Sequence, residues 1–188
     1  MSPVERCIVP ASQMHGVNPH VLRAILRVES GLKPDSVNVN ANGTKDVGIG
    51  QMNSIHFPAL MANGIAPRQL LDPCVGTYVA AWHLSKLIAD HGNSWEAIAR
   101  YHSATPYFNH RYQVLLNNEL VNAGAITSQM RPVPAMKSPD PKRSVPRDAE
   151  SSSDGAHVRT SIVIDDGSAS RTREVLRANP SKETHARN

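Results

Sequence analysis

Three polar side chains lie where predicted helices end or polar loops turn: Glu29, Gln51 and Tyr101. A carboxylic acid, an amide and a phenol could together surround a sugar hydroxyl or a glycosidic oxygen. Proton donation to a glycosidic oxygen needs a neutral carboxylic acid, so the pKa of that acid must rise from its ordinary value of about 4.3. These residue types therefore allow acid chemistry on a sugar if the fold brings them together.

The stretch from Val21 to Gly31 must position the carboxyl group, and its pattern predicts an amphipathic helix. Asn18 suits the N-cap, Pro19 suits the first helical position, and Gly31 can adopt the left-handed conformation past the last turn. Glu29 would then lie in the last turn, against the core and beside a loop. Partial desolvation could keep it protonated there. The competing interpretation is a solvated residue at a helix end.

The other segments predict an all-α domain with no convincing strand. Residues 32–47 read as a polar loop, in which only Val37 to Asn40 shows the alternation of a short strand. The two glycines at 48 and 50 suggest a backbone that approaches something closely. An Asn93–Glu96 capping pair is expected before the helix of Trp95. Further helices are expected at residues 3–15, 54–62, 66–71, 73–91, 95–102 and 107–122.

Composition divides the chain into a domain at 1–125 and a tail at 126–188. Every aromatic residue lies before residue 113, and the tail is rich in Pro, Ser and Arg, which predicts disorder. Up to Ala125, nine Lys and Arg balance eight Asp and Glu, so no nucleic-acid binding is expected. There is no apolar run long enough to cross a membrane. The scattered histidines, including His83 and His102, are interpreted as surface or capping residues rather than metal ligands, and we expect no cofactor.

Three motifs occur in order: Glu-Ser-Gly at 29–31, Gly-x-x-Gln-x-Asn at 48–53 and Ala-x-Tyr-His-Ser at 99–103. Over roughly residues 5–120 the chain resembles the soluble lytic transglycosylase family, which has a goose-type, lysozyme-like helical fold. It is most similar to the VirB1-like branch of type IV secretion and conjugation systems. That branch also has a cysteine before the catalytic helix and another in a Leu-Leu-Asp-Pro-Cys segment, here residues 70–74.

The resemblance implies that Glu29 is the catalytic acid and base of a peptidoglycan lyase. It would protonate the β-1,4 oxygen between N-acetylmuramic acid and N-acetylglucosamine. It would then accept the proton of the muramic C6 hydroxyl, which closes a 1,6-anhydro ring. Ser30 and Gln51 would shape the site, Tyr101 would bond Glu29 or the substrate, and Asn53 would be a neighbour.

This mechanism needs no second carboxylate, unlike the usual glycosidase pair. Asp35 and Asp46 are interpreted as turn residues that cap backbone amides. The family usually has Gly-Leu-Met-Gln where this chain has Gly50 before the glutamine, and it usually has asparagine where this chain has His102. We expect the lost methionine side chain to weaken substrate affinity or the desolvation of Glu29.

The resemblance also implies a disulfide between Cys7 and Cys74. A disulfide and a peptidoglycan substrate both place the protein in the periplasm. Residues 1–6 lack the start of a secretory signal, so we expect the true start to lie upstream. The expected partners are peptidoglycan glycan strands, and secretion or conjugation components through the tail.

Two other functions remain open from the sequence. One is a hydrolytic, lysozyme-like muramidase, which the missing second carboxylate disfavours. The other is a non-catalytic peptidoglycan-binding assembly module, for which the change at Gly50 leaves room.

Overall fold

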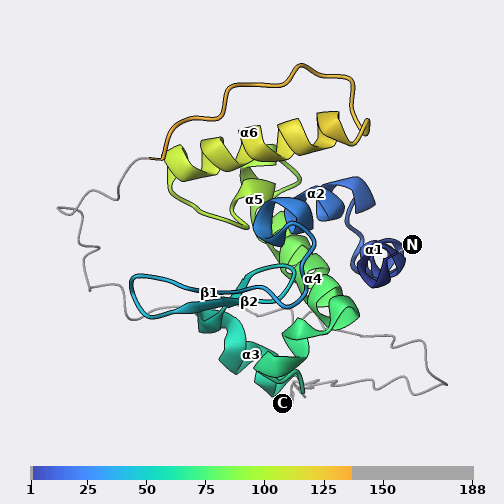
Figure 1. Ribbon diagram of the computed structural model, residues 1–188, viewed down its shortest axis with the longest axis vertical. Helices are drawn as coiled ribbons and strands as arrows, with labels where there is room; N and C mark the ends of the chain where they lie inside the picture. Colours follow the sequence, from blue (N-terminus) through green and yellow to red (C-terminus); the bar gives the residue numbers. More distant parts are fainter. Residues whose placement is uncertain (1, 137–188) are drawn as a thin grey trace, which may run out of the picture.

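The computed structural model of the protein describes residues 2–136, and helices dominate it (Figure 1). The mostly helical class predicted from the sequence is thus confirmed. The elements are, in order, α1 (Pro3–His15), α2 (Pro19–Ser30), β1 (Val37–Val39), β2 (Lys45–Val47), β3 (Met52–Asn53), η1 (Ser54–His56), α3 (Phe57–Ala62), η2 (Pro67–Leu71), α4 (Pro73–His91), α5 (Trp95–Ala99) and α6 (Pro106–Asn122), where η marks a short 3₁₀ helix.

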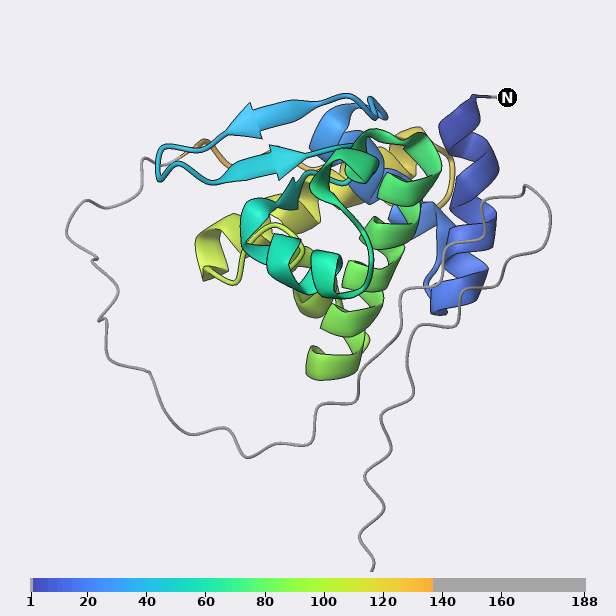
Figure 2. The same cartoon turned by 90° about the horizontal axis from the view of Figure 1, so that it is seen from below.

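Helix α4 is the central element, with α1 packed along it and α2 lying between α4 and α6 (Figures 1 and 2). The main core joins these helices through side chains with almost no exposure, such as Leu22, Leu84 and Leu116. A smaller cluster under the sheet contains Met52, Leu60, Ile65, Leu70, Val79 and Trp82. This burial supplies the main driving force for folding and fixes α2 against α6.

The local signals around α2 act as the sequence predicts. The side chain of Asn18 accepts hydrogen bonds from the backbone of His20 and Val21, at 2.9 and 3.3 Å. Gly31 has a φ of 66° and ends the helix in the left-handed conformation. Leu22, Ile25 and Leu26 are fully buried. Glu29 therefore lies in the last turn, as expected.

The prediction of a polar loop at residues 32–47 is wrong in part, because this segment contains β1 and β2 of a small antiparallel sheet. The sheet order is β1-β2-β3, with Val37 opposite Val47 and Asp46 opposite Asn53. All three residues of β1 are exposed, so this strand has no buried face to produce hydrophobic alternation. The sheet packs beside the ends of α2 and α4 (Figure 2).

Packed structure continues past the predicted domain boundary at residue 125. Residues 129–135, here called the strap, run back along α6 in extended form (Figure 1). Asn118 donates to the carbonyl of Arg131 at 2.7 Å and accepts from its N–H at 2.8 Å. The expectation that disorder begins at residue 126 therefore does not hold for the first part of the tail. Disorder in 137–188 concerns residues outside the described part and stays a prediction.

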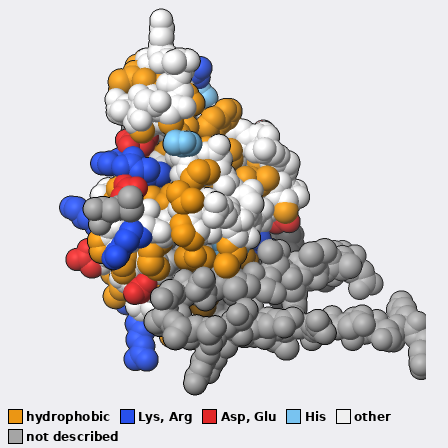
Figure 3. Space-filling model, turned by 90° about the vertical axis from the view of Figure 1, so that its right-hand side faces the viewer, with side chains coloured by type: hydrophobic (Ala, Val, Ile, Leu, Met, Phe, Trp, Pro, Cys, Tyr) orange, Lys and Arg blue, Asp and Glu red, His pale blue; other side chains and the backbone are white. Residues whose placement is uncertain are grey.

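Charges of both signs are interspersed on the face seen in Figure 3, rather than gathered by sign. This agrees with the near-neutral count up to residue 125, and the described residues visible on that side form no broad basic surface. Among residues 2–136, no helix combines the length and the apolar character that a membrane span requires.

The disulfide implied by the resemblance is present: Cys7 of α1 is bonded to Cys74 at the start of α4, with their Cα atoms 5.3 Å apart. It closes a sequence separation of 67 residues. In the chain-entropy picture, such a link restricts the unfolded chain and so stabilises the fold by roughly 4 kcal/mol.

We therefore predict that Cys7→Ala/Cys74→Ala lowers the free energy of unfolding by about 2–4 kcal/mol, measured by urea denaturation. Reduced wild-type protein should show a similar loss, which controls for the packing of the alanines. A double variant as stable as the oxidised wild type would contradict the stabilising role of this bond.

Candidate active site

A cleft of about 580 Å³ runs between the sheet and the helices. One wall consists of amide and carboxylate side chains of the sheet region, and the other of aromatic and charged side chains of the helical part. Its lining residues are Val28, Glu29, Asn38, Asn40, Asp46, Gln51, Met52, Asn53, His56, His83, Tyr101, His102, Arg111, Tyr112 and Leu115.

The carboxyl group of Glu29 meets this cleft from the last turn of α2. It accepts a hydrogen bond of 2.5 Å from the hydroxyl of Tyr112 on α6. Burial raises the pKa of Glu29 to about 7, the bond from Tyr112 opposes this shift, and the charge of Asp46 adds to it. Desolvation dominates because the ionised form loses water that one hydroxyl does not replace. Glu29 can thus hold a proton near neutral pH.

The hydroxyl that bonds Glu29 belongs to Tyr112, not to Tyr101. The sequence did not single out Tyr112, which lies in the last predicted helix. Its ring is 1% exposed and stacks on His102, with centroids 4.9 Å apart and planes 7° apart. Burial raises the pKa of Tyr112 well above 10, so it stays a neutral donor. The available signal was a tyrosine among the leucines of an otherwise apolar helix face, whose hydroxyl needs a partner when buried.

Tyr101 lines the cleft and donates to the carbonyl of Gly50 at 2.8 Å. This contact explains the glycine. A Cβ at position 50 would lie 2.7 Å from the Tyr101 hydroxyl and 2.8 Å from Cβ of Ala80. The space of a larger residue is filled here by Tyr101 and α4. Desolvation still raises the pKa of Glu29 to about 7 without a side chain at position 50. The expectation of weaker substrate affinity or weaker desolvation than with methionine stays a prediction.

Gln51 lines the cleft, yet its side chain is committed to the backbone around it. It donates to the carbonyls of Gly48 and Ser36, at 2.7 and 3.2 Å, and accepts from Asn38 at 2.5 Å. Its φ of 47° is left-handed, a conformation that costs a non-glycine residue energy. These bonds hold the turn in place. Gln51 thus positions the wall on which it lies.

Ser30 is not among the residues that line the cleft. Its hydroxyl donates to the carbonyl of Ile49 at 2.8 Å and so joins the end of α2 to the turn before Gln51. The sequence predicts that Ser30 helps to shape the site, and in the structure its hydroxyl contacts the backbone of this turn.

Asp46 lies in the cleft wall, which contradicts its interpretation as a turn residue that caps backbone amides. One of its oxygens accepts from Asn53 at 2.7 Å and the other from Asn40 at 2.8 Å. Asn53 also caps η1 through the N–H of Ile55. Asp46 is therefore a second carboxylate in the cleft, oriented by two amides, and the sequence missed it. Asp35 is exposed and outside the cleft lining.

The cleft histidines are neutral near pH 7. His83, predicted as a surface or capping residue, is instead largely enclosed, and burial lowers its pKa to about 3, helped by His56 and Lys86. Its ring centroid lies 4.8 Å from that of His56 and 5.1 Å from that of Tyr101. Burial likewise lowers the pKa of His102, and the charge of Arg111 adds to that effect.

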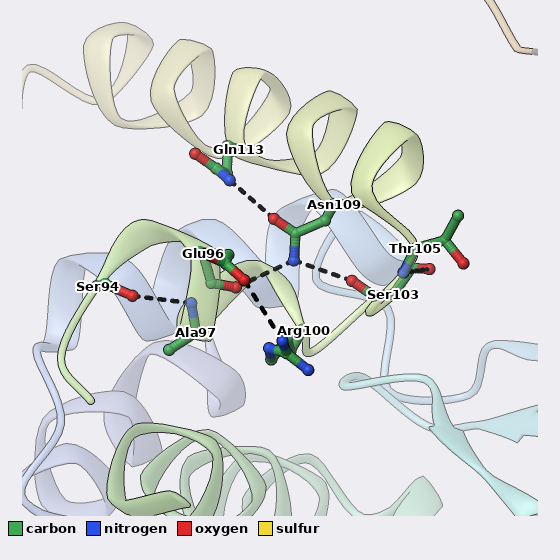
Figure 4. A network of polar contacts seen from close by, with 8 residues as sticks. All are labelled: Ser94, Glu96, Ala97, Arg100, Ser103, Thr105, Asn109 and Gln113. Carbon is green, nitrogen blue, oxygen red and sulfur yellow. Dashed lines mark hydrogen bonds and ion pairs between the residues drawn. The ribbon is translucent and has the colours of Figure 1, made fainter. Parts of the chain in front are cut away.

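The turn that carries Tyr101 and His102 is fixed by polar contacts between α5 and α6 (Figure 4). The side chain of Asn109 donates to the carbonyls of Glu96 and Ser103, at 3.0 and 2.9 Å, and accepts from Gln113. The predicted Asn93–Glu96 capping pair is wrong, because Ser94 caps α5 through the N–H of Ala97. The helix is also shorter than predicted and ends at Ala99.

Fold and site together define a small helical domain whose cleft holds one protonatable carboxyl group opposite a polar sheet. The family model described as "Transglycosylase SLT domain" matches residues 6–121. The chain belongs to this family, which confirms the resemblance drawn from the three motifs.

Curated relatives match a shorter stretch. Invasion protein IagB of Salmonella typhimurium (strain SL1344) is 38% identical over 100 residues, which are 53% of this chain and 62% of that protein. Protein IpgF of Shigella flexneri is 35% identical over 100 residues, which are 53% of this chain and 66% of IpgF. The X polypeptide of Escherichia coli is 33% identical over 98 residues, 52% and 58% of the two chains. The match thus spans less than two thirds of these relatives.

We predict that Gly50→Ala lowers the free energy of unfolding by roughly 1–3 kcal/mol, because the new methyl group overlaps the Tyr101 hydroxyl and Ala80. The control is a double-mutant cycle with Tyr101→Phe, which removes one of the two overlapping atoms. The cost of Gly50→Ala should be smaller in the phenylalanine background. An equal cost in both backgrounds would exclude this contact as the reason for glycine.

The raised pKa of Glu29 predicts a pH-dependent stability. The folded protein holds this proton up to about pH 7, whereas the unfolded chain loses it near 4.5. The stabilisation is therefore complete below pH 4.5 and is lost as the pH rises through 7, on the order of 3 kcal/mol in all. In urea denaturation between pH 5 and pH 8, the free energy of unfolding of Glu29→Gln should lack this part of the decline that the wild type shows. Glu119→Gln, outside the cleft, is the control. If the free energy of unfolding of Glu29→Gln falls with pH as steeply as that of the wild type, the raised pKa of Glu29 is refuted.

Proposed function

We propose that this protein is a peptidoglycan lytic transglycosylase that cleaves the β-1,4 bond between N-acetylmuramic acid and N-acetylglucosamine. One observation carries the proposal: the cleft contains a partly buried glutamate, Glu29, and desolvation raises its pKa to about 7. Such a group can donate a proton and take one back near neutral pH, which this reaction requires of a single residue. Membership of the transglycosylase SLT domain family supports the same reaction.

In the proposed mechanism Glu29 donates its proton to the glycosidic oxygen as the bond to C1 breaks. The resulting carboxylate is stabilised by the hydroxyl of Tyr112, which already points at one of its oxygens. The carboxylate then accepts the proton of the muramic C6 hydroxyl, whose oxygen closes on C1. The products are a 1,6-anhydromuramic end and a free N-acetylglucosamine end. Glu29 regains its proton in this step, so the enzyme is ready for the next cycle.

Hydrolysis is the second candidate, because Asp46 provides a second carboxylate in the cleft. Paired carboxylates across a sugar are the usual arrangement for adding water to a glycosidic bond. Both oxygens of Asp46 already accept amide hydrogen bonds, which makes it a weaker base toward water. We therefore assign Asp46 an electrostatic role, which is to help keep Glu29 protonated. The non-catalytic binding module gains no support from Gly50, since Glu29 is desolvated despite it.

We further propose that the enzyme works in the periplasm and opens the cell wall locally for a type IV secretion or conjugation apparatus. The disulfide between Cys7 and Cys74 supports an oxidising compartment. Partner components would engage residues 137–188, which lie beyond the family match at 6–121. Deleting these residues should leave muropeptide release intact while partner binding is lost.

The test is the product spectrum from purified sacculi by mass spectrometry. Wild-type protein should release 1,6-anhydro-muropeptides, and Glu29→Gln should lower that release by roughly 10²–10⁴-fold. Asp35→Asn, a carboxylate outside the cleft, is the matched control. Reducing-end muropeptides without the anhydro ring would favour hydrolysis. Near-normal release by Glu29→Gln would reject the mechanism.

A further inference from the structure

Among the described residues, Arg111 has no ion-pair partner, and it lines a cleft whose other side chains are neutral apart from one carboxylate. Among the described residues that line the cleft, no other is a lysine or arginine. The ion pairs found within residues 2–136 are Glu5–Arg23, Arg27–Glu119 and Glu96–Arg100, and none includes Arg111. A guanidinium that no carboxylate of residues 2–136 neutralises is available to an anion from outside this part of the chain.

The strap holds this guanidinium in place. Nε of Arg111 donates to the carbonyl of Pro134 at 2.9 Å. The strap is itself fixed by the two bonds between Asn118 and the backbone of Arg131, and Asn118 is only 9% exposed. An arginine has five N–H groups, so four remain after the bond to Pro134. The two terminal nitrogens thus present the planar fork that suits a carboxylate.

Arg111 also lies at the Glu29 end of the cleft. Its charge acts on His102, whose ring is stacked on Tyr112, and Tyr112 donates to Glu29. A muramic residue placed for cleavage at Glu29 would bring its lactyl group and peptide stem to this region. In a strand that carries peptide stems, the lactyl carboxyl forms an amide bond with the stem, so the sugars carry no charge. The only carboxylates of that substrate are on the stem.

We propose that Arg111, oriented by the strap, binds a carboxylate of the peptide stem and so selects stem-bearing glycan. This inference rests on the proposed function and names the part of its substrate that the cleft recognises. Asp46 lines the same cleft from β2, whereas Arg111 lines it from α6, so an anionic stem is attracted by Arg111 and repelled by Asp46.

The test compares two soluble glycan substrates: uncrosslinked strands with native stems, and the same strands with stem carboxylates converted to methylamides by carbodiimide and methylamine. Wild-type kcat/KM should fall ~10-fold on the amidated strands, as expected for loss of a charge-assisted contact. Arg111→Gln should show no preference for native over amidated strands. Arg111→Lys should recover part of the preference. Arg68→Gln, an exposed arginine outside the cleft with the same charge change, should behave as wild type.

The outcomes separate two failures. A preference for native stems that persists in Arg111→Gln overturns the inference, as does an equal loss by this variant on both substrates. Wild-type protein that cleaves neither strand overturns the proposed function itself.

The strap has its own test in the full chain. Asn118→Ala removes both bonds to Arg131 without touching the cleft. It should raise KM for native strands and leave amidated strands unaffected. An equal effect on both substrates would show that the strap serves stability alone.

Discussion

The structure depends on one partly buried hydrogen bond, which the hydroxyl of Tyr112 donates to the carboxyl of Glu29. The two residues come from helices that are far apart in the sequence, so the contact forms only if α2 and α6 are packed against each other in a fixed position. Burial of Leu22, Leu26 and Leu116 does this from the core side. At such a site the ionised glutamate is costly, and a single hydroxyl compensates only part of that cost. The proton is therefore retained at a pH where an exposed glutamate would lose it.

The opposite wall is set by a backbone that approaches η2 and α4 more closely than side chains allow. A Cβ on Gly48 would lie 2.1 Å from the carbonyl oxygen of Leu70, and Gly48 has a φ of 79°. Gly50 is equally confined, by Tyr101 and Ala80. The two glycines let the turn pack against η2 and α4, and the hydrogen bonds of Gln51 then hold it there. The polar wall of the cleft is thus positioned by packing beneath it, not by the substrate.

The features that the sequence predicts correctly depend on residues that are close together in the chain. The caps of α2 involve only residues 18–31, so the helix and the place of Glu29 in its last turn follow from neighbours in the chain. The close approach at Gly48 and Gly50 was also predicted, although the partner was not. The sheet escaped prediction because β1 is exposed and its pattern carries no buried face.

Long-range pairs could not be predicted for a different physical reason. Tyr112 is 83 residues from Glu29, and a buried tyrosine gives no sign of which acceptor it reaches. Asp46 likewise reads as a turn residue until β2 places it beside β3. The strap is bound through its own backbone carbonyls, which any sequence provides, so composition alone suggests a tail. In each case the tertiary arrangement gives the residue its role.

The central claim is that Glu29 is protonated near neutral pH because its carboxyl is buried. The most direct measurement is a pH titration of the Glu29 side-chain carboxyl carbon by ¹³C NMR in the free protein, assigned through Glu29→Gln. We predict a midpoint near 7. A midpoint near 4.5, the ordinary value for an exposed glutamate, would contradict the claim.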